Sequence, residues 1–118
     1  MPEGTRMPEG TTMTDAKSRG LLLVMIEVEP AHEADFNRWY NEEHVPERLS
    51  VPGILNARRF VAIEGEPKYL ALYDLESPDV LQSEAYTKLL AGTPWTNETK
   101  KHWIRSVRNV YREIPTTP

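Results

Sequence analysis

The chain has 118 residues, contains no Cys, and carries 14 Lys or Arg against 18 Asp or Glu, a net charge of −4. The length suits a single domain, and the missing Cys excludes disulfides and Cys-based zinc sites, as expected of a protein in the reducing cytoplasm. The negative charge argues against a dedicated nucleic-acid-binding protein, because neutralising phosphates needs a clustered cationic surface. The longest apolar run, 21–26, is far shorter than the roughly 20 residues that cross a bilayer, so no membrane partner is expected.

Residues 1–19 contain three stretches that begin with Met, at Met1, Met7 and Met13, and no branched apolar or aromatic side chain. Such a segment buries too little surface to offset the entropy of ordering it, so we expect a flexible tail. Each of the three Met residues is a candidate translation start, and the segment lacks the apolar stretch of a signal peptide. A recognition tail is the alternative reading, and the folded domain is expected over residues 20–115.

Residues 21–29 have the pattern of a β-strand that is apolar on both faces, so both faces should be covered. A helix should follow Pro30, because apolar and aromatic side chains recur there at spacings of three and four. Its inner face would hold His32, Phe36, Trp39, Tyr40 and Glu43. The helix should end near His44, because Pro46 disfavours helical geometry at the preceding residue.

A polar connection at 64–67 joins two further strand-like runs and predicts an antiparallel hairpin. Ser77, followed by Pro and Asp, has the pattern of a helix start. This second helix should run to about Leu90, because Gly92 and Pro94 would stop it. The other expected elements are a turn at 50–53, a helical turn at 97–103, and strands at 54–63, 68–76 and 104–114.

The expected order β, α, β, β, α, β predicts an α+β, ferredoxin-like fold, with a four-stranded antiparallel sheet and both helices on one side. The second face of the strand at 21–29 is also apolar and needs to be buried, but a monomer of this size has no further layer to bury it. Two such sheets packed face to face would provide it, so a homodimer is expected.

The segment FNRWYNEEHVPERLSVPGILNARRF, at 36–60, resembles the EthD-like branch of the dimeric α+β barrel superfamily. The shared features are an aromatic-rich first helix ending in His-Val-Pro, a Val-Pro-Gly turn and a strand that begins Ala-Arg-Arg-Phe. The resemblance implies a homodimer whose sheets form a barrel, with a small-molecule pocket in each subunit between the sheet and the helices. Relatives include cofactor-independent monooxygenases, polyketide cyclases, muconolactone isomerases and haem-degrading enzymes, but no haem-binding pattern is visible here and no cofactor is expected.

His44 is the sharpest catalytic candidate, because an imidazole titrates near neutral pH and can exchange a proton with a bound ring or enolate. Its place at the expected helix end would favour the protonated form. The alternative is a capping His that bonds terminal carbonyl groups. Tyr40 is a second catalytic candidate and Trp39 a substrate-binding one, although an aromatic stripe at helical spacing equally suits a core.

Arg58 and Arg59 are neighbours on a strand, so they point to opposite faces and one of them faces a covered layer. A buried guanidinium needs an acid or an anion, and Asp74 on the next strand is a suitable partner. We expect Arg58 to face the barrel interior as an anion clamp, because it shares a face with Asn56 and with Phe60, a substrate-binding candidate. The alternative is a salt bridge that fixes the sheet or the dimer.

Tyr73 shares a face of its strand with Tyr69 and would orient a substrate through its hydroxyl, although Tyr is also an ordinary strand residue. Trp95 lies in the expected loop after Gly92 and would bind substrate as a lid or cover a dimer edge.

Metal and nucleophile chemistry are weaker alternatives. Residues that could bind a metal are present, namely His32, His44 and His102 with Glu43 or Glu47. They form no closely spaced His and acid motif, so no metal site is expected. Nucleophilic catalysis is weaker still, because Cys is absent and no Ser lies in a Gly-x-Ser-x-Gly elbow.

The leading functional hypothesis is a small-molecule enzyme that acts by proton transfer on a cyclic or aromatic, oxygen-bearing compound, as an isomerase, cyclase, lyase or cofactor-free monooxygenase. His44 would be the acid or base, Arg58 the anion clamp, and Tyr40 and Tyr73 the orienting groups. Two alternatives stay open: a non-catalytic homodimer that binds a hydrophobic small molecule, and a structural dimer without a pocket.

Overall fold

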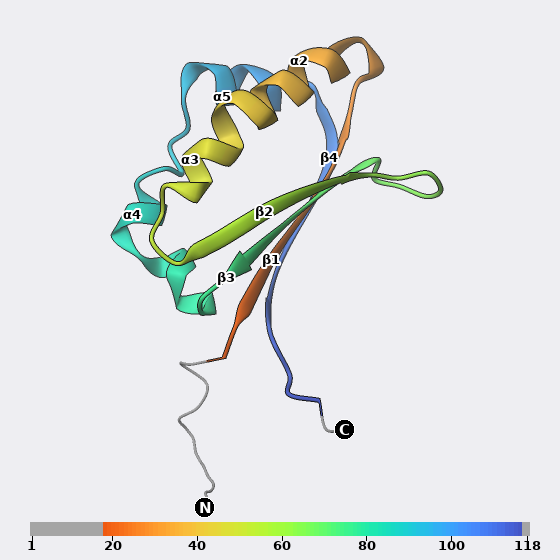
Figure 1. Cartoon of the computed structure of the whole chain (residues 1–118). Helices are drawn as coiled ribbons and strands as arrows, with labels where there is room; N and C mark the ends of the chain where they lie inside the picture. Colours follow the sequence, from red (N-terminus) through yellow and green to blue (C-terminus); the bar gives the residue numbers. More distant parts are fainter. Residues whose placement is uncertain (1–17, 117–118) are drawn as a thin grey trace, which may run out of the picture.

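A computed structural model describes residues 18–116 of the chain. Four antiparallel strands form one sheet in the order β2-β3-β1-β4, and the helical segments lie on one of its faces (Figure 1). The strands are β1 (Gly20–Val28), β2 (Ile54–Val61), β3 (Tyr69–Leu75) and β4 (Trp103–Arg112). The predicted βαββαβ order and ferredoxin-like fold are therefore confirmed, whereas the tail predicted for residues 1–19 falls, up to residue 17, outside the described part.

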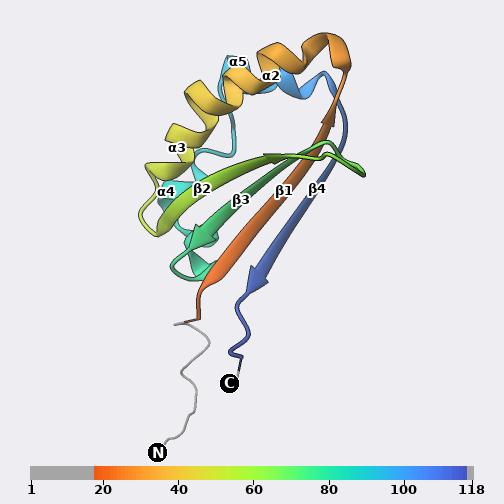
Figure 2. The same cartoon turned by 45° about the vertical axis from the view of Figure 1, so that its right-hand side comes forward.

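The double-faced apolar strand occupies the interior of the sheet. β1 pairs with β3 on one side and with β4 on the other, so its backbone is hydrogen-bonded along both edges. Leu22, Ile26 and Val28 are buried against the helices, while Leu21 and Leu23 point to the other face and stay half-buried. Seen from the side, that second face carries none of the described helices (Figure 2).

The helical connection between β1 and β2 runs past the predicted end near His44, so that expectation is wrong. It consists of the 3-10 turn η1 (Pro30–His32), α2 (Glu33–Trp39), the π-helical turn η2 (Tyr40–His44) and α3 (Val45–Leu49). The wide turn lets the amide of Val45 donate to the carbonyl of Tyr40, five residues earlier. The α-helix then restarts with Pro46 in its first turn, where a missing N–H is tolerated.

The second connection is also divided differently from the prediction. In place of one helix from Ser77 to Leu90 there are a 3-10 turn η3 (Pro78–Gln82) and α4 (Glu84–Thr87). The helical turn predicted at 97–103 is α5 (Pro94–Lys100), which begins and ends three residues earlier. Ser77 caps η3 as predicted, since its hydroxyl accepts from an amide at 3.0 Å. Ser83 adopts an extended backbone and caps α4, which breaks the expected helix, and Thr93 caps α5 in the same way. None of the described helices is long and apolar enough to cross a bilayer.

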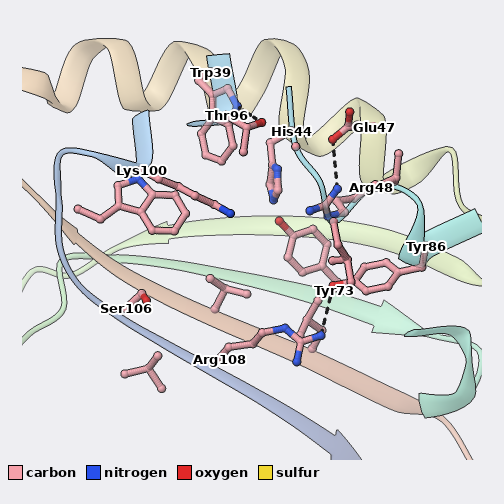
Figure 3. A pocket seen from close by; sticks show the side chains of 17 residues that line it. Trp39, His44, Glu47, Arg48, Tyr73, Tyr86, Thr96, Lys100, Ser106 and Arg108 are labelled. Atoms are coloured by element: carbon pink, nitrogen blue, oxygen red, sulfur yellow. Dashed lines mark hydrogen bonds and ion pairs between the residues drawn. The ribbon is translucent and has the colours of Figure 1, made fainter. Parts of the chain in front are cut away.

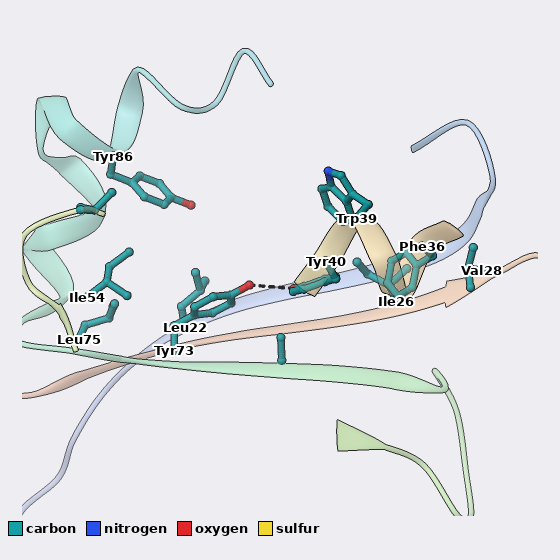
Figure 4. Packing of buried hydrophobic residues seen from close by; sticks show 12 residues of the cluster. Leu22, Ile26, Val28, Phe36, Trp39, Tyr40, Ile54, Tyr73, Leu75 and Tyr86 are labelled. Carbon is teal, nitrogen blue, oxygen red and sulfur yellow. Dashed lines mark hydrogen bonds between the residues drawn. The ribbon is translucent and has the colours of Figure 1, made fainter. Parts of the chain in front are cut away.

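Aromatic rings dominate the core between the helices and the sheet (Figure 4). Phe36 makes ring contacts with Trp39 at 6.0 Å and with Tyr40 at 5.5 Å between centroids. The hydroxyl of Tyr73, on β3, donates to that of Tyr40 at 2.9 Å, so the paired polar tips are satisfied inside the core. The largest fully buried side chains are Trp39, Tyr73, Phe36, Ile26, Leu75 and Val28.

Candidate functional site

A pocket of about 200 Å³ opens between the helical layer and the β1–β4 side of the sheet. Figure 3 shows His44 and Lys100 reaching into it from the helices, with Arg108 and Ser106 on the strand below. Its walls come from segments far apart in sequence, because η2, α5 and β4 all contribute side chains. The expectation of a pocket between the sheet and the helices thus has a physical counterpart at His44.

His44 lies within a continuous helix and not at a helix end. Its ring packs against Trp39 at 4.5 Å and against the edge of Tyr40 at 4.8 Å between centroids. Among the described residues, its Nδ1 atom is buried without a hydrogen-bond partner. Because that atom is closed off from the pocket, the other ring nitrogen, Nε2, is the one that can meet a bound molecule.

The electrostatic surroundings keep His44 neutral. Burial, followed by the nearby charges of Arg48, Lys100 and Arg59, lowers the pKa of His44 to about 3. The expected preference for the protonated form is therefore wrong, because the helix continues and presents cations in place of a negative end. At neutral pH the imidazole is an acceptor for a proton and not a donor of one.

Three cationic side chains line the same pocket. Arg48 pairs with Glu47 at 3.1 Å, so its charge is compensated. The guanidinium of Arg108 donates to the hydroxyl of Tyr86 at 3.2 Å, and the ammonium of Lys100 lies 6.0 Å from the ring of Trp103. No carboxylate of the described residues lies within ion-pair distance of Lys100 or Arg108, so the pocket carries uncompensated positive charge.

Trp103 contributes a second unpaired polar atom. Its Nε1 is buried and, like Nδ1 of His44, has no partner among the described residues. Trp103 lines the pocket at the start of β4. The wall thus offers an imidazole and two cations to whatever enters, while the indole N–H of Trp103 is closed off from the pocket.

The partly buried carboxylate of Glu43 holds the helices above the pocket in place. It accepts hydrogen bonds from the indole of Trp39 at 3.1 Å, from the hydroxyl of Thr96 at 3.2 Å, and from the hydroxyl of Thr93. These bonds tie α2 and η2 to the start of α5 and fix the ring that packs on His44. Sequence reasoning assigned Glu43 no such role, although an acid on the inner face of an aromatic helix was a usable signal.

Tyr73 lines the pocket, and Tyr40 lies behind it. Burial raises the pKa of both phenols, so each is neutral at physiological pH. Their mutual hydrogen bond occupies the hydroxyl proton of Tyr73. Tyr73 is only 1% exposed, so it forms part of the apolar wall of the pocket and offers no free hydroxyl to a ligand.

The two neighbouring Arg residues point to opposite faces, as their spacing requires. Arg59 faces the helices, where its guanidinium lies 4.4 Å from the ring of Tyr40 and donates to Asn37 at 2.7 Å. Arg58 lies on the other face and forms the predicted ion pair with Asp74 at 3.6 Å. The structure therefore does not bring Arg58 together with His44. Any clamp role of Arg58 belongs to the face of the sheet that carries none of the described helices, which we call the open face.

Two further candidates also lie away from His44. Phe60 shares the open face with Arg58 and is 44% exposed. Trp95 belongs to the first turn of α5 and not to a loop, and its indole donates to Asp35 at 3.2 Å. Neither residue lines the His44 pocket.

The pocket therefore brings together three of the predicted site residues: Trp39, His44 and Tyr73. It adds Lys100 and Arg108, which sequence reasoning did not single out for this site, and Trp103, which follows Trp95 in sequence and was, like Trp95, a candidate to close a pocket or cover a dimer edge. The basic character of 100–112 was visible in the sequence, but the side on which each of these residues would point was not. The described wall offers one imidazole and the already paired Glu47, so it does not present a set of metal ligands.

No protein-family model matches the sequence, and no curated protein matches it either. Solved structures do match. A dimeric ferredoxin-like protein from an uncultured marine organism superposes with a TM-score of 0.63 at 15% identity, covering 89% of this chain and 95% of that chain. An ethyl tert-butyl ether D (EthD) family protein from Bacillus halodurans gives 0.60 at 14% identity, covering 81% and 99%. A candidate antibiotic biosynthesis monooxygenase from Bordetella bronchiseptica gives 0.59 at 19% identity, covering 85% and 99%.

These likenesses confirm the ferredoxin-like fold that the segment at 36–60 implied, and the proteins that share it include a dimeric ferredoxin-like protein and an EthD family protein. At such low identity they establish a shared architecture and not a shared reaction.

Proposed function

We propose that the chain is a small-molecule enzyme that binds an acidic, planar organic compound in the His44 pocket and moves a proton on it. The observation that carries the proposal is a neutral, buried imidazole beside uncompensated cations in one pocket. A carboxylate, phenolate or enolate oxygen would complement Lys100 and Arg108, and a ring would pack against Tyr73 and Trp103. The fold neighbours support small-molecule chemistry only as a class.

The proposed reaction follows from the neutral imidazole and the two cations that line the pocket. A proton on carbon next to a carbonyl would pass to His44, and the electron pair left behind would move onto the oxygen as an enolate. Lys100 and Arg108 would stabilise that negative charge. Returning the proton to a different atom of the substrate completes an isomerisation or ring closure without any cofactor. An oxygenase reaction would need dioxygen as a co-reactant in addition.

The basicity of His44 depends on the ligand. Burial is the largest cause of the pKa of about 3, and the nearby cations lower the pKa further, so the imidazole is a weak base. A bound anion opposes the cations but not the burial, so binding should raise the pKa in part and make His44 a better proton acceptor. Substrate binding would thus activate the base.

The size of the pocket limits the substrate. About 200 Å³ is below the roughly 300–1,000 Å³ of clefts that hold drug-sized ligands, so a compound with one ring or two small rings is expected.

The second candidate function is binding without catalysis. The low pKa of His44 favours it, since a carrier needs only the cations and the aromatic walls. The two proposals agree on the ligand and differ on what His44 does.

One experiment separates them. Small aromatic carboxylic acids and phenols are screened for binding by calorimetry and for turnover by mass spectrometry, using the wild type, Lys100→Met and His44→Gln. Lys100→Met should weaken binding of the anion about tenfold or more, while Lys88→Met, at the exposed C-terminus of α4, should not change it. His44→Gln should keep binding and lose turnover. Binding without turnover in the wild type would leave the carrier, and equal affinity in Lys100→Met would remove the anion site.

We propose further that two copies pack through the open face of the sheet. Leu21, Leu23, Leu70 and Leu72 point to that face and remain only half-buried in one protomer, beside the Arg58 ion pair. A second copy supplies the same apolar surface in return, as a two-fold interface requires. A neighbour that is itself a dimeric ferredoxin-like protein supports this assembly.

A further inference from the structure

We propose that Glu29, His32 and His102 form a binding site for a divalent transition metal of the zinc type, separate from the His44 pocket. Their ligand atoms, one from each side chain, all lie within 4.8 Å of one another. The two imidazoles come from segments seventy residues apart, at 32 and 102, so their meeting is a product of the fold. The sequence offered these ligand types but no spacing that joined them.

The distances are close to those a metal needs. Oε1 of Glu29 lies 3.7 Å from Nε2 of His32 and 3.2 Å from Nδ1 of His102. Ligand atoms at 2.0–2.1 Å from a tetrahedral ion are roughly 3.3 Å apart, so the carboxylate already sits at ligand spacing from both imidazoles.

The orientation of His102 is a second and independent indication. While its Nδ1 faces Glu29, its Nε2 lies 3.6 Å from Oε2 of Glu98. Metal-binding imidazoles commonly direct their other ring nitrogen to a carboxylate, which fixes the tautomer and the ring plane. Glu98 would play that supporting part, and Lys101 holds its other oxygen at 3.1 Å.

The backbone places these side chains in advance. The amide of Glu29 donates to the carbonyl of His102 at 3.0 Å, and the amide of His32 donates to the carbonyl of Glu29 at 2.8 Å. Pro30 begins the 3-10 turn between Glu29 and His32 and restricts its backbone. In Figures 1 and 2 the end of β1, the start of α2 and the start of β4 gather at one end of the molecule.

Only a local side-chain movement is needed for binding. The rings of His32 and His102 are stacked 3.4 Å apart with an interplanar angle of 9°. Each ring must tilt so that its nitrogen lone pair meets the ion, and the half-exposed position of both side chains leaves room for this. Two imidazoles and one carboxylate suit Zn²⁺, Co²⁺, Ni²⁺ or Cu²⁺ and not Mg²⁺ or Ca²⁺, which prefer oxygen ligands. A bound ion would link the end of β1 to the start of β4.

Titration of the untagged full chain with Co²⁺ and Zn²⁺ tests the proposal, because Co²⁺ absorbs in the visible range when bound by imidazole nitrogen. We expect one ion per chain, an absorption band with Co²⁺, and a higher melting temperature with Zn²⁺. His32→Ala and His102→Ala should each weaken binding at least tenfold, and Glu98→Gln about tenfold.

The chain has 3 His, so the remaining one supplies the matched control. His44→Gln should bind Co²⁺ and Zn²⁺ as the wild type does. The proposal is overturned if the wild type shows no saturable binding at millimolar metal, if His32→Ala and His102→Ala bind unchanged, or if His44→Gln loses binding. Circular dichroism of each variant without metal shows whether a loss of binding comes from a loss of fold.

Discussion

Replacing His44 with Gln should make the protein less sensitive to acid. Burial and the neighbouring cations lower the pKa of His44 from 6.5 to about 3, so the folded chain keeps the imidazole neutral. Below pH 6.5 the unfolded chain binds a proton at this residue that the folded chain does not bind. Protonation therefore favours unfolding, and stability falls as the pH falls from about 6.5 towards 3.

The size of the effect follows from the two pKa values. Between pH 7.5 and pH 5 the unfolded imidazole gains its proton almost completely, while the folded one stays neutral. At 1.36 kcal/mol for each pKa unit, this costs about 2 kcal/mol of the free energy of unfolding. The result changes little for any folded pKa below about 4, because pH 5 lies above it. Gln has no proton to gain, so His44→Gln should lack this part of the acid response.

Urea unfolding at pH 7.5 and pH 5, at one fixed protein concentration, measures the difference for each variant. His32→Gln is the matched control, because the side chain of His32 is half-exposed and its substitution leaves the buried imidazole of His44 in place. The wild type and His32→Gln should lose about 2 kcal/mol more than His44→Gln over this interval. Equal losses in all three proteins, or an NMR titration of His44 with a midpoint near 6.5, would refute the account of a neutral, buried imidazole.

Three further predictions concern the helical layer and the open face. Thr96→Val removes a buried hydroxyl bonded to Glu43, so unfolding should become about 1–3 kcal/mol easier in urea. Gly53→Ala should lower the free energy of unfolding by more than Gly65→Ala does. Both Gly residues have φ near +98 to +99°, but only at Gly53 would the new Cβ lie 2.5 Å from a side chain of η3. Equal losses in the two variants would contradict this. Leu72→Glu places a charge on the open face and should shift the protein from dimer to monomer in light scattering, while an unchanged mass would reject that face as the interface.

The sequence was sufficient for the order of elements, because each strand had a clear apolar pattern and each connection had a turn signal. Ser77 was recognised as a cap because Pro and Asp follow it. Ser83 carried no comparable flanking signal, yet its hydroxyl ends one helical segment and starts the next. A single Ser within a helical pattern is therefore poor evidence for a break until the tertiary contacts are known.

The site was harder to predict than the fold, since it depends on which way single side chains point. Arg58 and Arg59 are chemically alike, and a shift of one residue in register exchanges their faces. The pairing of Arg59 with Ala71 settles the choice, because Ala71 is buried under the helices. The sequence also did not determine where Lys100 and Arg108 point, because each becomes part of the pocket only through the placement of α5 and β4.

The π-helical turn is the point where local backbone geometry determines the chemistry of the pocket. Had the helix ended at His44, its free carbonyl groups would have favoured a protonated imidazole. The wide turn instead satisfies Val45 from Tyr40 and places Pro46 where a missing amide does no harm. The helix then continues to Arg48, one turn further on, whose charge adds to burial, the largest cause, in lowering the pKa of His44. A neutral imidazole among cations is therefore a consequence of how this chain carries a helix past a proline.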